Sequence, residues 1–405
     1  MSVEEFPVID DRFLQHTHER LDELRGPVCP FHGSWGGGSY LVTGYEDARA
    51  LLTDSRVSKS NQGARELLAA KIGEENLSGL GTLLGDHMLN SDPPDHTRLR
   101  KLVNRAFTAR TVARLRPRIE EITRELLDGM AGQEQADLMT AFALPLPITV
   151  ICELLGVRPE DRGEFSGWSN TLLAGATEDF GAIEQAAVQM HGYLASLVEG
   201  KRAEPGEDML SALVLATDEG DALTEQELVG MAFLLLVAGH ETTVNLIGNA
   251  TLALLRAPEQ AAKLRADPEL LPGAVEEFLR FDGPINLATM RYTTEDVPVG
   301  DSTIPAGEFV QVSLLAANRD EGRFPDPDDL DVTRPPGGHL AFGHGIHYCV
   351  GAPLARLEAE IALGGLLNRF PDLTLAVPED ELDYRKSTLV HGLNALPVRL
   401  GAARP

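Results

Sequence analysis

The longest apolar stretch of the chain most constrains how it can fold. It runs from Met231 to Leu255 and is interrupted by four polar residues, His240, Glu241, Asn245 and Asn249. A charged residue near the centre of a lipid-facing helix costs about 3 kcal/mol, so this stretch is too polar to span a membrane. We therefore expect a long helix through the core of a soluble protein. Thr224 and Glu227, three residues apart, have the spacing of a capping box and predict where that helix begins.

The remaining sequence predicts a mainly α protein with a smaller β portion. Helical periodicity dominates residues 93–280, and one further helix is expected over 351–370. Short extended segments punctuated by Gly and Pro lie near 1–60 and 285–400. Because no repeat or low-complexity linker divides the chain, we predict a single domain over residues 1–405.

Charge and cysteine content narrow the classes of partner and compartment. The chain has 35 Lys and Arg against 62 Asp and Glu, a formal net charge of −27, which argues against nucleic acid as a partner. Three cysteines fit no disulfide framework and favour a reducing cytoplasm. The acidic N-terminus lacks the features of a signal peptide. We expect a cytoplasmic monomer with no membrane contact.

A glycine-rich loop carrying a cysteine precedes the last helix. Its sequence is Phe342-Gly343-His344-Gly345-Ile346-His347-Tyr348-Cys349-Val350-Gly351. A thiolate there would be stabilised by the N–H groups and dipole of the following helix, and the glycines permit a close approach to a flat ligand. A haem iron held by Cys349 would use both features. Two alternatives stay open: a structural cysteine, or a zinc site at His344, His347 and Cys349 that lacks a fourth ligand.

Glu241 and Thr242 place a carboxylate and a hydroxyl in the middle of the apolar helix. Burying a charge is costly, and no local partner for Glu241 is evident, so the pair is a functional candidate. The structural alternative is that Thr242 hydrogen-bonds back to a carbonyl of its own helix. Just before it, the small residues Ala238 and Gly239 would leave space for a ligand against the backbone.

The helix after Pro94 carries basic residues on two sides. His96 and Arg100 fall at the flank of its apolar stripe, where they could reach inward to an anion, whereas Arg98, Lys101 and Arg105 fall on the outward side. Residues 96–118 hold eight Lys or Arg and no acidic residue. An ordinary solvated face is the simple explanation. Because the local charge opposes the global charge, we favour a docking patch for an acidic redox partner.

Four motifs, in order along nearly the whole chain, resemble those of the cytochrome P-450 superfamily. They are Asp92–Arg100 with its His-x-x-x-Arg spacing, Ala238–Thr243, Glu277-x-x-Arg280, and the Phe342–Gly351 loop. The chain is most similar to soluble bacterial members, particularly actinobacterial enzymes that tailor macrolides and polyketides. The resemblance implies the cytochrome P-450 fold, with haem between the long central helix and the cysteine loop.

This resemblance implies a role for each motif. Haem b would have the Cys349 thiolate as axial ligand, and the cofactor-binding residues would be His96, Arg100, Ala238, Gly239, Arg291, Phe342, Gly343, His347, Cys349 and Gly351. Thr242 would hydrogen-bond the oxygen being activated, and Glu241 would supply protons through water so that the O–O bond breaks. The substrate pocket would be lined by Leu83, His87, Leu234, Val237, Asn286, Leu287, Thr289, Leu389 and Val390.

Periodicity and resemblance disagree about Glu277 and Arg280. Helical periodicity places both away from the apolar face and favours Glu276–Arg280 as the ion pair. The resemblance implies instead that Glu277 and Arg280 are buried and structural. The chain also has Asp329 where the family usually places a basic third partner, so Arg323 or Arg334 could substitute.

The expected function is a haem-thiolate monooxygenase that hydroxylates or epoxidises a bulky apolar secondary metabolite, with a macrolide or polyketide favoured. Electrons would come from a ferredoxin and its separate reductase, because the chain has no flavin or nicotinamide domain. A peroxide-driven haem oxygenase is an alternative with the same fold, although Glu241 and Thr242 argue against it. A zinc-site protein and a non-catalytic haem sensor are the alternatives from other classes.

Overall fold

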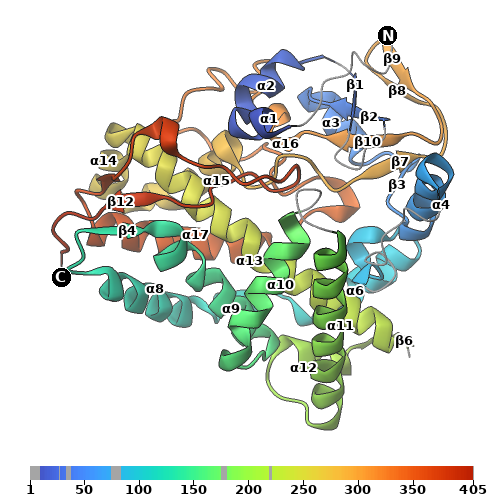
Figure 1. Cartoon of the computed structure of the whole chain (residues 1–405), viewed down its shortest axis with the longest axis horizontal. Helices are drawn as coiled ribbons and strands as arrows, with labels where there is room; N and C mark the ends of the chain where they lie inside the picture. The colour runs from blue at the N-terminus through green and yellow to red at the C-terminus, as the bar shows by residue number, and fades with distance from the viewer. Residues whose placement is uncertain are drawn as a thin grey trace.

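Helix α13, Glu225–Arg256, runs through the middle of the molecule, and other helices pack around it (Figure 1). The computed structural model describes residues 10–26, 28–32, 38–73, 84–174, 180–218 and 221–404. Both capping-box hydrogen bonds form at the start of α13: Glu227 N donates to Thr224 Oγ1 (3.2 Å), and Thr224 N donates to Glu227 Oε2 (2.8 Å). The predicted helix start is therefore confirmed. Among the described helices, α13 alone is long and apolar enough to span a membrane, and 72% of its apolar window is buried inside the protein.

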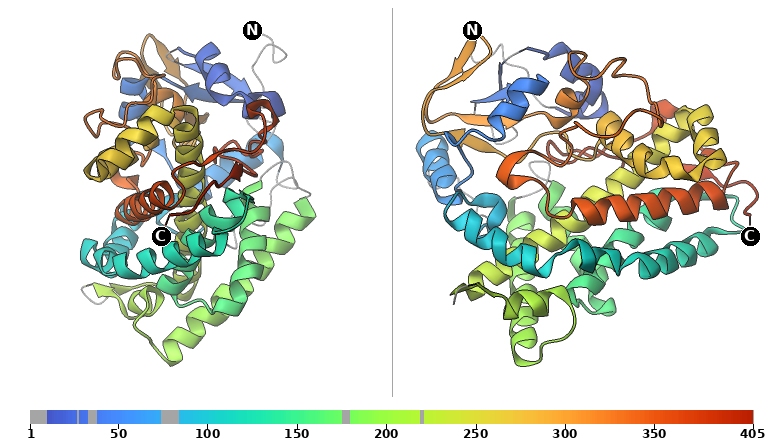
Figure 2. Two further views of the ribbon diagram at one scale, coloured as in Figure 1. Left: turned by 90° about the vertical axis from the view of Figure 1, so that its left-hand side faces the viewer. Right: turned by 180° about the vertical axis from the view of Figure 1, so that it is seen from behind.

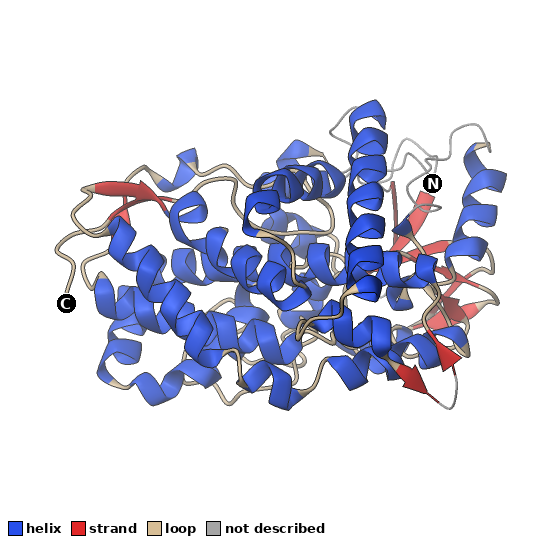
Figure 3. Ribbon diagram, turned by 90° about the horizontal axis from the view of Figure 1, so that it is seen from below, coloured by secondary structure: helices blue, strands red, loops and turns tan. Residues whose placement is uncertain are grey.

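Helices form most of the described chain (Figure 3). Besides α13, the α-helices are α1 (Asp11–Gln15), α2 (Thr17–Glu23), α3 (Tyr45–Leu51), α4 (Asn61–Ile72), α6 (Asp95–Ala106), α7 (Ala109–Ala113), α8 (Arg116–Met130), α9 (Pro145–Leu155), α10 (Arg162–Ala174), α11 (Phe180–Ala203), α12 (Met209–Leu215), α14 (Pro258–Ala266), α15 (Leu271–Asp282), α16 (Leu314–Asn318) and α17 (Ala352–Arg369). The last of these confirms the helix predicted over 351–370. The mainly α class is confirmed as well.

The strands form small sheets. They are β1 (Cys29–His32), β2 (Gly38–Val42), β3 (Val57–Ser58), β4 (Gln135–Asp137), β5 (Thr217–Asp218), β6 (Asp221–Ala222), β7 (Arg291–Thr293), β8 (Val297–Val299), β9 (Ser302–Ile304), β10 (Phe309–Val312), β11 (Thr374–Leu375) and β12 (Pro397–Arg399). The largest sheet has the order β1-β2-β10-β7-β3, in which only β2 and β10 are parallel. Segments from both ends of the chain thus meet in one sheet. A second sheet, β11-β12-β4, lies at the opposite end of the molecule (Figure 3).

The main hydrophobic core lies between the central helices. It joins α6, α8, α9, α11, α12 and α17 to α13. Leu102, Phe142 and Leu236 are among its fully buried residues. In Figure 2, α8 and α17 run side by side, in agreement with their extensive contacts. A smaller core packs α3 against the five-stranded sheet. The loop that precedes α17 and the middle of α13 are therefore both held by rigid elements.

Candidate active site

Cys349 lies at the end of a tight loop whose shape depends on glycine. The backbone N–H of Cys349 donates to the carbonyl of Phe342 (2.9 Å) and closes the loop. Gly343 and Gly345 have positive φ values, 71° and 76°, that other residues rarely adopt. A Cβ on Gly345 would also lie 2.8 Å from Thr53 Cγ2 and 3.1 Å from the carbonyl oxygen of Leu52. The loop is thus packed against the turn after α3, and any side chain at position 345 would push it away.

Two opposing effects act on the charge of the Cys349 sulfur. Burial raises the pKa of the thiol, while the backbone N–H groups of Gly351 and Ala352 and the Arg100 guanidinium act in the opposite direction. The helix N-terminus predicted from the sequence is therefore present, but it does not fully offset the cost of burial. Coordination to a metal ion would hold the sulfur as a thiolate despite this burial. One thiolate on a well-packed loop suits a haem iron, because the porphyrin supplies the other protein-independent ligands.

Basic side chains from four segments converge near this loop. The rings of His96 on α6 and His347 lie 4.4 Å apart between centroids. Burial, and then the charges of Lys59, Arg291, His96 and Arg100, lower the pKa of His347 to about 2. Burial also lowers the pKa of Arg291 to about 10. The structure thus gathers the four anion-binding residues expected from the sequence: His96, Arg100, Arg291 and His347.

Several nitrogen atoms in this group are buried and have no hydrogen-bond partner. Both ring nitrogens of His96 and the Nε of Arg291 make no hydrogen bond within the protein. His96 is 3% exposed and Arg291 is 6% exposed. Buried, unpartnered donors carry a free-energy cost unless a ligand binds them. Concentrated positive charge with unused donors is the environment that the two propionates of a haem require, so these residues fit the expected cofactor.

Lys59 is a member of the same group that the sequence did not indicate. It is 4% exposed, and its ammonium group hydrogen-bonds to Thr289. Burial, followed by the charge of Arg291, lowers the pKa of Lys59 well below its usual value, and Asp92 is the opposing negative charge. No local pattern could have identified Lys59, because its burial results from contacts with residues distant in sequence.

The middle of α13 has an opening on one side. Ala238 is exposed and Gly239 and Thr242 are partly exposed, although most residues around them on α13 are buried. Ala238 and Thr242 are one helical turn apart, so they share a face. The Thr242 hydroxyl donates to the carbonyl of Ala238 (2.9 Å), which is the back-bond considered as the structural alternative. That bond still leaves the hydroxyl oxygen at the opening with unused acceptor capacity.

Glu241 has a partner, contrary to the expectation that it had none. Arg385 Nη1 donates to Glu241 Oε2 at 2.8 Å, and His240 Nε2 lies 3.4 Å from Oε1. Burial alone would raise the pKa of Glu241, but His240 and Arg385 together lower it below its usual value. Glu241 is therefore a buried, ionised carboxylate beside Thr242. Local sequence could not reveal Arg385, which comes from a loop near the C-terminus.

The residues predicted to line a substrate pocket have mixed placements. Leu83 lies outside the described residues. Leu234 and Val237 belong to α13, one turn before its opening. His87 is buried, its ring stacks on Phe233, and burial lowers its pKa to about 4. The other predicted wall residues come from two segments that pair with each other through an Ile285–Val390 bridge: Asn286, Leu287, Thr289, Leu389 and Val390.

Asn286 is the most unusual member of this set. It is 1% exposed, and neither atom of its side-chain amide has a hydrogen-bond partner. Its backbone is well anchored, since its N–H donates to the carbonyl of Leu389 at 2.9 Å. The side chain therefore provides one unused donor and one unused acceptor among apolar walls.

Glu277 and Arg280 are buried, as the resemblance implied and contrary to the periodicity. Arg280 donates twice to Glu277, at 2.7 and 2.8 Å, and both residues are at most 3% exposed. Arg334 is the third partner, with its Nε 3.2 Å from Glu277. Asp329 contributes only its backbone carbonyl, to Arg280 and Arg334. The expected Glu276–Arg280 pair is wrong: Glu276 instead binds Arg356 at 2.6 Å and His339 at 3.1 Å.

The basic patch on α6 is less available than the sequence suggested. Arg98 forms ion pairs with Glu227 and with Asp221, the latter at 3.6 Å. Arg105 donates to the carbonyl of Thr217. Residues 96–118 contain no acidic residue, but acidic residues of α13 and β6 approach the basic patch from outside this segment. Of the three residues expected to face a redox partner, Arg98 has its charge compensated within the chain.

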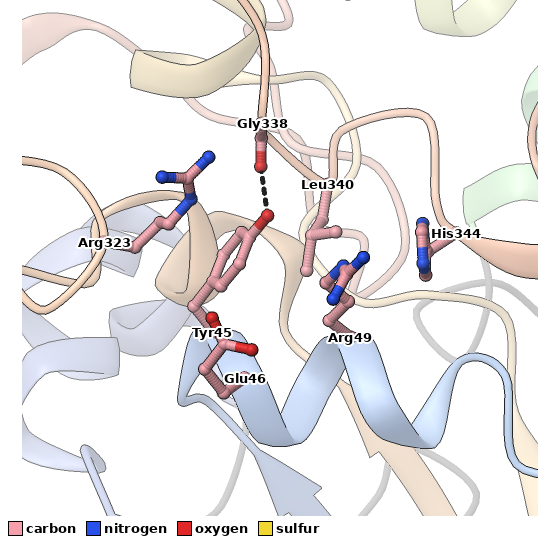
Figure 4. Close-up of a pocket in the computed structure, with 7 residues that line it drawn as sticks. All are labelled: Tyr45, Glu46, Arg49, Arg323, Gly338, Leu340 and His344. Carbon is pink, nitrogen blue, oxygen red and sulfur yellow. Dashed lines mark hydrogen bonds between the residues drawn. The ribbon is translucent and has the colours of Figure 1, made fainter.

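A separate pocket of about 360 Å³ lies near the cysteine loop (Figure 4). It is lined by Tyr45, Glu46, Arg49, Arg323, Gly338, Leu340 and His344. His344 points into this pocket, toward Arg49. Among the described residues, His344, His347 and Cys349 do not bring their ligand atoms within 4.8 Å of one another, so the zinc alternative finds no support.

Comparisons with known proteins agree with this geometry. Residues 169–391 match the family described as Cytochrome P450. The chain is 50% identical to the vitamin D(3) 25-hydroxylase of Pseudonocardia autotrophica over 402 residues, covering 98% of this chain and 97% of that protein. It is 45% identical to the 6-deoxyerythronolide B hydroxylase of Saccharopolyspora erythraea over 399 residues, covering 96% and 97%. The solved structure of the tirandamycin C-bound P450 monooxygenase TamI superposes with a TM-score of 0.90 at 50% identity, covering 97% of this chain and 100% of that one.

Proposed function

Since the chain belongs to the cytochrome P450 family and is a haem-thiolate monooxygenase, we propose that it hydroxylates or epoxidises a bulky, mostly apolar secondary metabolite of the macrolide or polyketide type. The reaction inserts one atom of O2 into the substrate and reduces the other to water, using two electrons and two protons. The observation that carries the proposal is the buried carboxylate of Glu241 beside Thr242, at the opening in α13.

Haem would be held by Cys349 as the iron ligand and by the basic group as partners of its propionates. His96, Arg100, Arg291 and His347 were expected in that role, and Lys59 joins them because its ammonium lies among their charges. Gly343 shapes the loop on one face together with Phe342 and Gly351, while the exposed Ala238 leaves room on the other. Gly239, next to it, makes room for Ile151 on α9, since a Cβ at position 239 would lie 2.9 Å from Ile151 Cδ1. When bound, the haem supplies the activation of O2 and its insertion into a C–H or C=C bond.

The chain's own contribution to this chemistry is the supply of protons. Glu241 is ionised and held by Arg385, so it can accept a proton from water and pass it on toward Thr242. The Thr242 hydroxyl, fixed by its bond to the Ala238 carbonyl, orients that proton at the opening. A peroxide-driven enzyme has less need of this arrangement, because peroxide already contains the protons.

The size and polarity of the substrate are inferred from the pocket walls. Leu234, Val237 and Val390 offer apolar surface, and Asn286 offers one polar anchor with both amide atoms unused. Such a wall suits a large apolar molecule that has few oxygen functions. Relatives named for vitamin D(3) and 6-deoxyerythronolide B support this size class.

We propose a ferredoxin and a ferredoxin reductase as the electron donors, because the described elements superpose on a solved P450 monooxygenase over 97% of this chain. The proposed docking face on α6 comprises Arg98, Lys101 and Arg105, and Glu227 and Asp221 offset the charge of Arg98. All three cysteines are free of disulfides, in keeping with a reducing cytoplasm.

The test is a reconstituted reaction under ¹⁸O2 with a ferredoxin, its reductase and NADPH. The substrate panel contains macrolactones, linear polyketides and vitamin D(3), and candidates are chosen by their displacement of iron-bound water in the absorption spectrum. We expect one ¹⁸O atom in the product and no product from Cys349→Ser. A parallel reaction with H2O2 and no electron donor separates the mechanisms. Faster turnover with H2O2 than with the ferredoxin chain would overturn the monooxygenase proposal in favour of a peroxide-driven oxygenase.

A further inference from the structure

The side chains of His18 and His391 meet at one carboxylate oxygen of Asp282, and the proposed reaction uses none of these three residues. His18 belongs to α2, Asp282 is the last residue of α15, and His391 lies in the loop before β12. Their ligand atoms all lie within 4.8 Å of one another, and among the described residues no other three His, Cys, Asp or Glu do so. We propose that His18, Asp282 and His391 form a binding site for a divalent transition-metal ion, Zn²⁺ in the first place.

Both histidines direct their Nε2 atoms at the same oxygen of Asp282. His18 Nε2 lies 2.7 Å from Asp282 Oδ1, and His391 Nε2 lies 3.0 Å from the same oxygen. The two imidazole rings are 5.5 Å apart between centroids and inclined at 76°, so they approach the carboxylate from different directions. Two imidazole nitrogens and one carboxylate oxygen form a donor set that Zn²⁺ accepts, with a fourth position left for water.

Two of the three ligands are held in place before any ion binds. His391 is 6% exposed, its ring stacks on Tyr384, and its N–H donates to the carbonyl of Pro284 at 2.9 Å. Asn249 on α13 donates to the backbone carbonyls of both Asp282 and His391, at 3.1 Å each. The backbone positions of these two ligands are thus fixed relative to each other by a third element.

The third ligand gives access from solvent. The His18 side chain is 25% exposed, whereas those of Asp282 and His391 are 7% and 6% exposed. An ion could therefore enter from the α2 side, and a water ligand could remain there. A site closed on two sides and open on one is typical of a zinc site with three protein ligands.

The protonation states and charges also suit a cation. Both imidazoles contact the ionised Asp282 through Nε2, and an ion that binds there would displace the protons of these two hydrogen bonds. Asp282 keeps its charge although it is buried, because the two imidazoles lower its pKa. Arg319 is the nearby cation that would oppose an ion, yet its donors are directed elsewhere, to the Phe281 carbonyl at 2.9 Å and Asp328 at 3.1 Å.

The experiment measures zinc binding to the intact holoenzyme. Protein is freed of adventitious metal with EDTA, dialysed against buffered Zn²⁺ and analysed for zinc and iron content. His18→Ala removes the exposed ligand, and Asp282→Asn removes the charge while keeping a similar shape. His16→Ala is the matched control, because His16 lies at the start of the same helix, is 56% exposed and has only Glu19 nearby at 3.7 Å.

We expect wild type and His16→Ala to bind one more equivalent of Zn²⁺ per haem than His18→Ala or Asp282→Asn. The extended fine structure beyond the zinc absorption edge of wild type should show two imidazole nitrogens at about 2.0–2.1 Å. An equal zinc content in wild type and His18→Ala would overturn the proposal, and so would an edge spectrum without imidazole ligands. The haem absorption spectrum of each variant verifies that it is folded.

Discussion

Arg385 and Glu241 are 144 positions apart in the sequence, and Arg385 Nη1 lies 2.8 Å from Glu241 Oε2. The Arg385 side chain is 17% exposed and that of Glu241 is 2% exposed, so the pair is shielded from water on the carboxylate side. The ion pair therefore joins a loop near the C-terminus to the middle of the central helix. It also helps to keep Glu241, the residue proposed to deliver protons, ionised.

Replacing Arg385 with Gln should change the pH dependence of the reaction. Only His240 would then oppose the effect of burial, so the pKa of Glu241 should rise. An opposite charge at this distance typically lowers a carboxyl pKa by about 1–3 units. The acid limb of product formation should therefore move to higher pH, with less product per electron consumed. Arg399→Gln is the control, since Arg399 is exposed and binds only the Leu375 carbonyl. Superimposable pH profiles for wild type and Arg385→Gln would contradict the role given to the pair.

Replacing Lys59 with Met should have opposite effects on the two forms of the protein. Without haem, the variant should unfold at a higher urea concentration than wild type, because a buried ammonium among other cations is gone. With haem, it should lose its cofactor faster, by about tenfold or more, since a hydrogen bond to a charged group contributes about 1.5–3 kcal/mol. Transfer of haem to apomyoglobin measures that rate.

Lys71→Met provides the comparison for Lys59, because Lys71 pairs with Glu308 in a more exposed setting, at 2.9 Å. Lys71→Met should change neither the urea concentration at which the haem-free protein unfolds nor the rate of haem loss. If haem loss from Lys59→Met is as slow as from Lys71→Met, then Lys59 does not contact a propionate.

Replacing Arg280 with Leu should destabilise the protein strongly. Glu277 would remain buried with only Arg334, which lies at 3.2 Å, as a charged partner. Removing one member of a buried ion pair typically costs about 3–5 kcal/mol. Urea unfolding at neutral pH gives the value, and Arg114→Leu, at an exposed position before α8, should cost less than about 0.5 kcal/mol. A loss below about 1 kcal/mol at position 280 would show that the network contributes little to stability.

The ion pair of Glu276 and Arg356 should make the free energy of unfolding depend on pH in the acid range. Despite burial, which raises it, the pKa of Glu276 is lowered to about 2 by Arg356 and His339. A carboxyl whose folded pKa is depressed contributes stability above its unfolded pKa, near 4.3, and loses that contribution as the pH falls toward the folded value. The difference in unfolding free energy between wild type and Glu276→Gln should hence be constant from pH 7 to about 5. Below that it should shrink by up to about 1.4 kcal/mol per pH unit. A difference that stays constant down to pH 3.5 would rule out the depressed pKa.

Local sequence patterns predicted the secondary structure well where the pattern itself is the cause. Thr224 and Glu227 form their capping box because the spacing alone brings side chain and backbone together. The glycines of the cysteine loop are similarly explained by the positive φ values at Gly343 and Gly345. In both cases the interacting groups lie within a few residues of one another.

Partners distant in sequence were the part that could not be predicted. Lys59 contacts Thr289 and Asp92, and Glu241 pairs with Arg385. Neither environment can be predicted from the residues adjacent in sequence. Periodicity even misplaced Glu277, because the segment from Phe324 to Arg334 covers what would otherwise be the outer face of α15. Only the family resemblance gave its burial correctly.

The loop from Tyr384 to Leu393 contacts three different sites in the protein. Arg385 holds Glu241, Val390 forms the bridge to Ile285 beside the proposed substrate pocket, and His391 binds Asp282. A mutant library aimed at this loop to change regioselectivity will therefore also vary how efficiently electrons are used. Variants selected only for a new product will tend to waste reducing equivalents. Screens on this enzyme should score product and NADPH consumption in the same well.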